Sequence, residues 1–206
     1  MASIGNVPGS LWEKAFQLLD SDTQKGLGPS KTNRRDVLVS IAPEPLNRSS
    51  GSFAYYHFPE QSAVLQEVEK ARDLALRKRW KFTKPNGDVV IVRDVMEKIA
   101  GWIQRFKETG DAAVQYDPAH AALPWAAFRF LLQTTVSEVQ VFTAVATDLE
   151  DIARRLARYR MIEKLHVRGI QSDIEREVER ALIRLYAEIL THLSYAVRFY
   201  SRKNNQ

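Results

Sequence analysis

The segment PAHAALPWAAFRFLLQ, residues 118–133, constrains the fold of this chain more than any other part of its sequence. As a helix it is apolar on nearly every side, and such a helix is stable only when other elements surround it. Asp117-Pro118 fits a helix start, because proline is tolerated in the first turn. Pro124 lies inside the run, where it either begins the regular part of the helix or kinks it. We therefore predict that residues 118–133 form the central helix of a bundle.

The segments around this helix repeat apolar residues at helical spacing. Ser10 with Glu13, and Ser172 with Glu175, have the spacing of capping boxes, which mark helix starts. Long helices joined by short loops favour antiparallel packing. We predict an all-α, antiparallel multi-helix bundle of about six helices, formed by residues 1–206 as a single domain. The expected helices are 11–20, 61–80, 93–108, 118–133, the stretch from 137 to the break at Gly169, and 172–200.

Two stretches lack a clear helical pattern. Residues 21–60 are rich in proline and turn residues, so we predict a loop-rich excursion, either with one short element or partly disordered. Pro85-Asn86-Gly87 stands before the short apolar run 89–92. An Asn-Gly pair between short runs fits a hairpin, and an irregular turn fits it equally well.

Motifs that would indicate catalysis are missing from the sequence. The chain has no cysteine, which excludes disulfides and cysteine-based metal sites. It has no GxxxxGK[ST] phosphate loop and no GxGxxG turn. Asp111 and Asp117 stand where helix caps are expected, so we do not interpret them as an acid/base pair. We expect no enzymatic activity, no cofactor and no metal. The histidines, which lack metal-site spacing, are His57, His120, His166 and His192.

The first expected helix carries a compact apolar stripe. It is a candidate membrane-active helix, which would lie in a lipid interface. The alternative is that the same stripe docks on the bundle. No apolar run of the chain reaches the roughly 20 residues of a membrane-spanning helix. The stripe consists of Leu11, Trp12, Ala15, Phe16 and Leu19.

The formal net charge is +5, which is compatible with an anionic partner. Around Trp80 and Phe82 basic and aromatic residues alternate, as in some nucleic-acid contacts. We favour a helix end with both rings tucked into the core, because no RNP, helix-turn-helix or zinc signature is present. Nucleic acid is therefore not an expected partner. The candidate basic, lipid-facing patch consists of Arg77, Lys78, Arg79, Lys81, Arg154, Arg158, Arg176, Arg180 and Arg184.

Several strings are similar to one known family. They are LWEKAFQLL, KRWKF, VRDVMEKIAGWIQRFKETGDAAVQYDPAHAALPWAAFRFLLQTTVSEVQVF, RRLARYRMIEKLHV and LIRLYAEILTHLSYAVRFY. Across residues 11–20 and 77–200 the chain resembles the N-terminal domain (NACHT_N) of fungal NWD-type NACHT receptors, which are NOD-like (STAND) proteins. It is also distantly similar to HeLo-like and MLKL-like helical bundles. The core of the matching motif is Pro118, Pro124, Trp125, Phe128, Phe130 and Leu131.

The resemblance implies a cytoplasmic effector domain in fungal innate immunity, as in heterokaryon incompatibility. Programmed cell death would follow from oligomerisation and membrane permeabilisation, with recruitment to the plasma membrane on activation. The alternative is a non-lytic protein-interaction or autoinhibition module of the same receptors. Implied partners are the NACHT and repeat regions, a homotypic oligomer, or an anionic membrane. The chain fits either a piece of such a receptor or a stand-alone effector.

The packing of the first helix distinguishes these two functions. A shallowly docked helix would suit an element that is released on activation. A deeply buried helix would favour a purely structural role.

Overall fold

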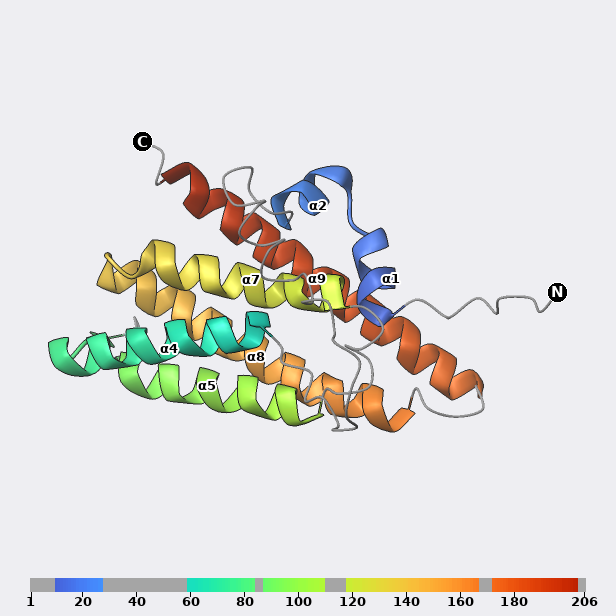
Figure 1. Cartoon of the computed structure of the whole chain (residues 1–206), viewed down its shortest axis with the longest axis horizontal. Coiled ribbons are helices and arrows are strands. Elements are labelled where there is room, and N and C mark those ends of the chain that lie inside the picture. The colour runs from blue at the N-terminus through green and yellow to red at the C-terminus, as the bar shows by residue number, and fades with distance from the viewer. Residues whose placement is uncertain (1–9, 28–58, 84–86, 110–117, 167–171, 204–206) are drawn as a thin grey trace, which may run out of the picture.

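The computed structural model describes residues 10–27, 59–83, 87–109, 118–166 and 172–203 (Figure 1). These residues form seven helices and one two-stranded sheet, which confirms the predicted all-α bundle and adds a small hairpin to it. The helices are α1 (Leu11–Gln17), α2 (Ser21–Leu27), α4 (Pro59–Lys78), α5 (Val92–Thr109), α7 (Pro118–Thr135), α8 (Val139–His166) and α9 (Asp173–Lys203). The strands are β1 (Lys81–Thr83) and β2 (Val89–Ile91).

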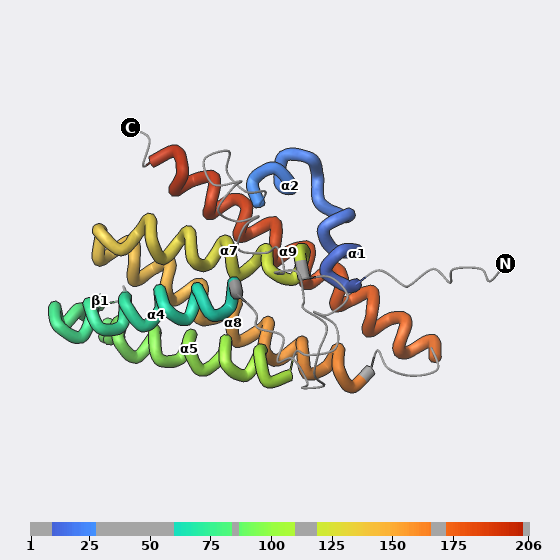
Figure 2. The backbone as a smooth tube through the Cα atoms, viewed as in Figure 1, coloured from blue at the N-terminus to red at the C-terminus, as the bar shows by residue number. Residues whose placement is uncertain are grey.

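Four helices form a ring in which each packs against the next, in the order α4, α5, α8, α7. The chain neighbours α4 and α5 run antiparallel, as do α7 and α8 (Figure 2). Helix α9 packs on α7 and α8 from outside the ring. Helices α1 and α2 lie on α9, so the beginning and the end of the chain pack together (Figure 1).

Helix α7 is the centre of this arrangement, as its apolar sequence predicts. It contacts α4, α8, α9 and α1. Trp125 and Phe128 are fully buried, and the Trp125 ring meets those of Phe106 and Phe128 edge to face at 4.9 and 5.3 Å. Pro124 is buried within the helix. Truncating an aromatic side chain in such a core costs about 3–5 kcal/mol, so these rings are major contributors to stability.

Two local signals predicted helix starts correctly. The Ser10 hydroxyl accepts a hydrogen bond from the Glu13 amide at 3.0 Å and caps α1. Ser172 and Glu175 form a complete capping box before α9, because each side chain accepts the backbone N–H of the other residue, at 2.7 and 3.2 Å.

The structure assigns both ends of the predicted loop-rich excursion, residues 21–60, to helices. Helix α2 occupies residues 21–27, and α4 begins at Pro59. Asp20 caps α2, since its Oδ1 accepts the amides of Thr23 and Asp22 at 2.9 Å each. These hydrogen bonds, chiefly that from Thr23, hold the pKa of Asp20 below its usual range. The rest of the excursion, 28–58, lies outside the described residues.

Of the two interpretations of residues 85–92, the hairpin is the one that forms. Strands β1 and β2 are antiparallel, with Lys81 opposite Ile91 and Phe82 opposite Val90. Residues 84–86 lie outside the described part of the chain. Gly87 has φ +88, in the left-handed region that favours glycine.

Helix α2 approaches α9 closely at Gly26. The Ser194 hydroxyl, buried on α9, donates a hydrogen bond to the Thr23 carbonyl at 3.0 Å. A Cβ placed on Gly26 would lie 2.3 Å from that hydroxyl oxygen and 3.0 Å from Cδ of Arg198. The contact between the two helices therefore requires glycine at this position.

We expect Gly26→Ala to lower the free energy of unfolding by about 1–3 kcal/mol, because the added methyl group overpacks the contact. Gly101→Ala is the matched control: Gly101 is an exposed helical glycine whose added Cβ would meet nothing within 4 Å. That substitution should stabilise the protein by about 0.5–1 kcal/mol through helix propensity. Chemical denaturation measures both. Equal effects of the two substitutions would contradict this account of the α2–α9 contact.

Candidate functional site

Helix α1 is anchored on α9 by a pair of stacked rings. The Trp12 and Tyr186 rings lie 4.1 Å apart, centroid to centroid, with only 4° between their planes. Trp12 is 2% exposed and Tyr186 is fully buried. The indole N–H of Trp12 is buried and has no hydrogen-bond partner among the described residues. Packing of the rings, rather than polar contact, therefore holds Trp12 in place.

A charged pair is buried beneath this stack. Arg160 and Glu163 of α8 form an ion pair of 2.7 Å, and their side chains are 3% and 6% exposed. The Tyr186 hydroxyl donates a hydrogen bond to Oε2 of Glu163 at 3.0 Å. Burial, with the nearby Glu163 carboxylate, raises the pKa of Tyr186 well above its ordinary value. Helices α1, α9 and α8 are thus linked through a continuous buried contact from an indole to an ion pair.

The edges of α1 are fixed by further contacts. Lys14 forms an ion pair with Glu179 of α9 at 2.5 Å. The Phe16 ring lies 5.0 Å from that of His120 on α7. Helix α1 therefore touches both α9 and the central helix.

The structure places the candidate membrane-active stripe inside the protein. Leu11, Trp12, Ala15 and Leu19 are at most 8% exposed, and Phe16 is half-buried against the core. Of the two interpretations, docking on the bundle is the one observed. The exposed apolar residue of this segment is Leu18, at 62%.

The motif shared with the resembling family is also a packing motif. Trp125, Phe128 and Leu131 belong to the buried core, and Phe130 packs partly buried against it. Pro118 begins α7 and Pro124 lies within it. The side chains of this motif that the structure describes are therefore used in packing the bundle.

The basic residues predicted as one patch lie in separate places. Arg77, Lys78, Arg79 and Lys81 gather at the end of α4, whereas Arg176, Arg180 and Arg184 belong to the beginning and middle of α9 (Figure 1). On α8, Arg154 pairs with Asp151. On α9, Arg176 pairs with Asp173 and Arg180 with Glu177. A single continuous basic face is therefore not formed.

On α8 the four-residue spacing of Glu150 with Arg154, and of Asp151 with Arg155, predicts two ion pairs, and the second of them forms. Arg155 pairs with Asp151 at 2.7 Å and, through this hydrogen bond, lowers the pKa of the Asp151 carboxyl. The other pair differs, because Glu150 instead accepts the indole N–H of Trp102 at 2.9 Å. A contact with another helix replaces the expected contact within α8.

The end of α4 has an unusual backbone. The amide of Trp80 bonds to the Ala75 carbonyl at 3.0 Å and that of Arg79 to the Leu76 carbonyl at 3.3 Å, which is the Schellman pattern. Its left-handed residue is Arg79, with φ 50, where glycine is usual. A side chain in this conformation costs about 1–3 kcal/mol, so the backbone at Arg79 is locally strained.

Trp80 is the anchor of this end. It is 9% exposed and meets Phe142 of α8 edge to face at 5.7 Å. Phe82 is half-buried. This confirms the interpretation of a helix end whose Trp80 ring is tucked into the core. That ring is not available for stacking on a base.

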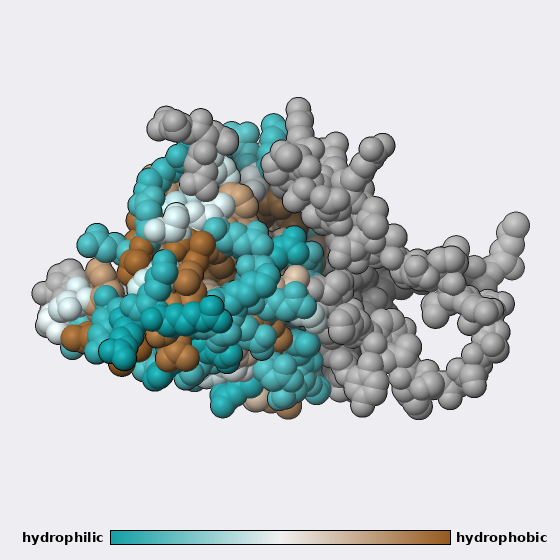
Figure 3. Space-filling model, turned by 60° about the vertical axis from the view of Figure 1, so that its left-hand side comes forward, coloured by the Kyte–Doolittle hydropathy of each residue, from teal (hydrophilic) through white to brown (hydrophobic). Residues whose placement is uncertain are grey.

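We call the surface formed by Leu76, Arg77, Lys78, Arg79, Lys81, Val89 and Ile91 the basic hairpin end. Leu76, Val89 and Ile91 are 54%, 60% and 37% exposed, and the four cations are exposed as well. Lys78 lies 5.7 Å from the centre of the Trp80 ring. Figure 3 turns this end of the bundle toward the viewer and shows apolar surface interleaved with hydrophilic surface.

A second exposed surface follows α9. Glu188, Tyr195 and Arg202, spaced by seven residues, are all exposed, so they share one side of the helix. Phe199 beside them is 64% exposed and Tyr195 is 59% exposed. Tyr195 and Phe199 also line an open surface hollow with Arg198, Arg202 and Lys203. We call Glu188, Tyr195, Phe199 and Arg202 the outer stripe of α9.

No group of His, Asp and Glu side chains able to hold a metal ion occurs among the described residues. His192 contacts Asp148 at 2.6 Å and His120 contacts Phe16. His57, Asp111 and Asp117 lie outside the described residues, as does the side chain of His166. None of the helices described here is both long and apolar enough to cross a membrane.

The fold and these surfaces define an all-helical bundle with contact surfaces on its outside. The chain belongs to the family described as Domain of unknown function (DUF7708), whose model matches residues 94–206, more than half of the chain. The match begins in α5 and includes α7, α8 and α9. Comparison with curated proteins and with solved structures finds no match.

The buried tyrosine predicts a dependence of stability on pH. The pKa of Tyr186 is raised in the folded state, whereas an unfolded tyrosine ionises near pH 10. Its contribution to stability is complete below about pH 10 and is lost as the pH rises further. We expect Tyr186→Phe to reduce the alkaline loss of stability. Tyr195→Phe, at an exposed tyrosine of the same helix, should leave that loss unchanged. Denaturant unfolding at several alkaline pH values measures both, and identical curves for the two variants would refute the assignment.

Proposed function

We propose that this chain is an N-terminal signalling domain of NLR-like receptors of the NACHT class, acting in the cytoplasm as a non-lytic protein-interaction module. The receptor class rests on the sequence resemblance, because the DUF7708 family carries no assigned function. The mode of action rests on the burial of α1. Leu11, Trp12 and Ala15 of its apolar face are buried within the fold, so we place the surfaces for partners on other elements.

The outer stripe of α9 supports a homotypic contact. In an antiparallel pairing of two α9 helices centred on Tyr195, Arg202 of one copy lies opposite Glu188 of the second copy. This follows from the equal seven-residue spacing on either side of Tyr195. The same arrangement is repeated on the other side of the two-fold axis, as a closed symmetric dimer requires. Tyr195 and Phe199 supply the apolar centre, and aromatic residues are favoured there.

The proposed contact is tested by static light scattering over a series of concentrations. We expect the apparent mass to rise with concentration and Tyr195→Asp with Phe199→Asp to abolish that rise. The control is Met161→Asp with Leu165→Asp, which changes two residues of α8 with similar exposures, 56% and 70%, and the same spacing. A mass that stays monomeric at every concentration would contradict the homotypic contact.

A charge exchange tests the geometry itself. Glu188→Arg places like charges opposite each other in the dimer and should weaken it several-fold, since an exposed pair contributes about 0.2–1 kcal/mol. Adding Arg202→Glu restores opposite charges and should recover association. Failure of the double variant to recover would exclude the antiparallel register.

A second candidate function is membrane permeabilisation after release of α1. The observation in its favour is that polar groups are buried where α1 packs on the bundle. Release of α1 would return the Trp12 indole N–H to water and would lower the desolvation cost of the ion pair between Arg160 and Glu163, which offsets part of the lost apolar contact. A released α1 would present its apolar face to lipid, as an amphipathic helix does at an interface.

Dye release from anionic vesicles by the oligomerised protein tests this second candidate. We expect Lys14→Glu to increase release, because it turns the Lys14–Glu179 ion pair into a repulsion that loosens α1. Adding Glu179→Lys restores the attraction and should return release to its original level. Trp12→Asp with Phe16→Asp removes the face that would enter lipid and should prevent release. The absence of dye release from every form of the protein would eliminate this candidate.

A further inference from the structure

The basic hairpin end carries an excess of positive charge. The described residues between 76 and 91 contain four cations and one carboxylate, that of Asp88. Among the described residues, no carboxylate lies within ion-pair distance of Arg77, Lys78, Arg79 or Lys81.

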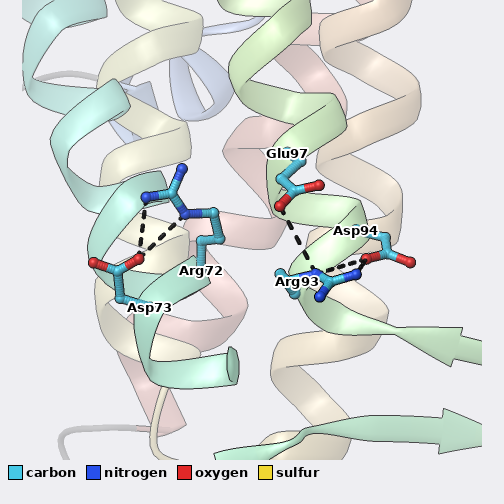
Figure 4. Close-up of polar contacts among 5 residues, drawn as sticks. All are labelled: Arg72, Asp73, Arg93, Asp94 and Glu97. Carbon is cyan, nitrogen blue, oxygen red and sulfur yellow. Dashed lines mark hydrogen bonds and ion pairs between the residues drawn. The ribbon is translucent and has the colours of Figure 1, made fainter. Parts of the chain in front are cut away.

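Two arginines close to this surface in the chain, one on α4 and one on α5, are paired with carboxylates. Arg72 of α4 pairs with Asp73 at 3.1 Å. At the start of α5, Arg93 pairs with Asp94 at 2.7 Å and with Glu97 at 3.8 Å (Figure 4). The four cations of the basic hairpin end differ from these neighbours, because no carboxylate of the described residues pairs with them.

The same end exposes aliphatic side chains. Lys81 and Ile91 are partners across the hairpin, and Thr83 and Val89 are the next exposed pair. Because side chains alternate along a strand, these four share the outer face, while Phe82 and Val90 point inward. Together with Leu76 of α4, the basic hairpin end therefore exposes three aliphatic residues, and it also exposes four cations.

The strain at Arg79 is the independent observation. Glycine at this position would relieve the left-handed backbone, yet the chain has an exposed arginine there. A strained residue at the surface indicates a role other than stability.

We propose that the basic hairpin end is a docking surface for an anionic lipid membrane. Its cations would pair with lipid headgroups while Leu76, Val89 and Ile91 enter the boundary between headgroups and acyl chains. Recognition of bases is disfavoured, because Trp80 is buried. The contact is peripheral, since none of the described helices can span the membrane. It does not depend on the outer stripe of α9, which lies on another helix.

Co-sedimentation with vesicles tests this proposal. The full chain should bind vesicles of phosphatidylcholine mixed with phosphatidylserine and not vesicles of phosphatidylcholine alone. Binding should weaken as salt is raised, because exposed charges are screened. Equal binding to both kinds of vesicle would overturn the proposal.

Arg79→Gly separates binding from stability. It should raise the thermal midpoint by relieving the strain and weaken vesicle binding about fivefold by removing one cation. Val89→Ser with Ile91→Ser should weaken binding through the loss of aliphatic contact. Unchanged vesicle binding in Arg79→Gly would refute the proposed surface.

The matched control keeps the net charge equal. The variant Arg77→Gln with Arg79→Gly removes two positive charges at the basic hairpin end. The variant Arg176→Gln with Arg180→Gln removes two positive charges at the start of α9. Only the first double variant should reduce binding, and an equal reduction by both would show a non-specific charge effect that overturns the proposal.

Binding to polyglutamate but not to anionic vesicles would assign this surface to an acidic protein instead. Light scattering and dye release are separate readouts, so the proposals for α9 and α1 can fail independently of this one.

Discussion

Helix α7 has almost no polar side, and the arrangement of the other helices follows from the need to cover it. An apolar helix exposed on any face would leave Trp125, Phe128 or Leu131 in water, at a cost of roughly 1.5–3 kcal/mol for each side chain. Helices α4, α8, α9 and α1 each cover part of this surface. Helix α1 is therefore part of the layer that covers the core, and this is why Leu11, Trp12 and Ala15 on its apolar face are buried.

The place where α1, α9 and α8 meet combines strong packing with buried charge. The Trp12–Tyr186 stack contributes apolar contact, while the ion pair between Arg160 and Glu163 is satisfied partly through the Tyr186 hydroxyl. Such a pair adds little net stability, but the loss of one partner leaves the other charge buried and costs about 3–5 kcal/mol. The arrangement of these three helices is thus specific: few alternative packings satisfy the ring stack and the charges together.

The two exposed surfaces belong to different elements and differ in chemistry. The outer stripe of α9 balances Glu188 against Arg202 and suits a copy of itself, whereas the basic hairpin end has cations in excess and suits an anionic partner. Because the two proposed contacts use separate surfaces, one domain would be able to make both at the same time. Multiple copies on one membrane would then bind more tightly than a single copy, because linked sites raise the effective concentration.

Apolar periodicity and the capping-box spacings determined every described helix except α2, as well as the central position of residues 118–133, because these features depend on local spacing and on the burial of apolar side chains. Helix α2 was not predicted, because its apolar stripe is short and only one side chain, that of Asp20, caps its start. Only the tertiary structure decided what covers each stripe. It placed Trp12 against Tyr186, buried Glu163 with Arg160, and divided the predicted basic patch among the end of α4, α8 and α9. The physical reason is that an amphipathic pattern records which side of a helix avoids water, whereas the partner on that side is set by residues far away in the chain.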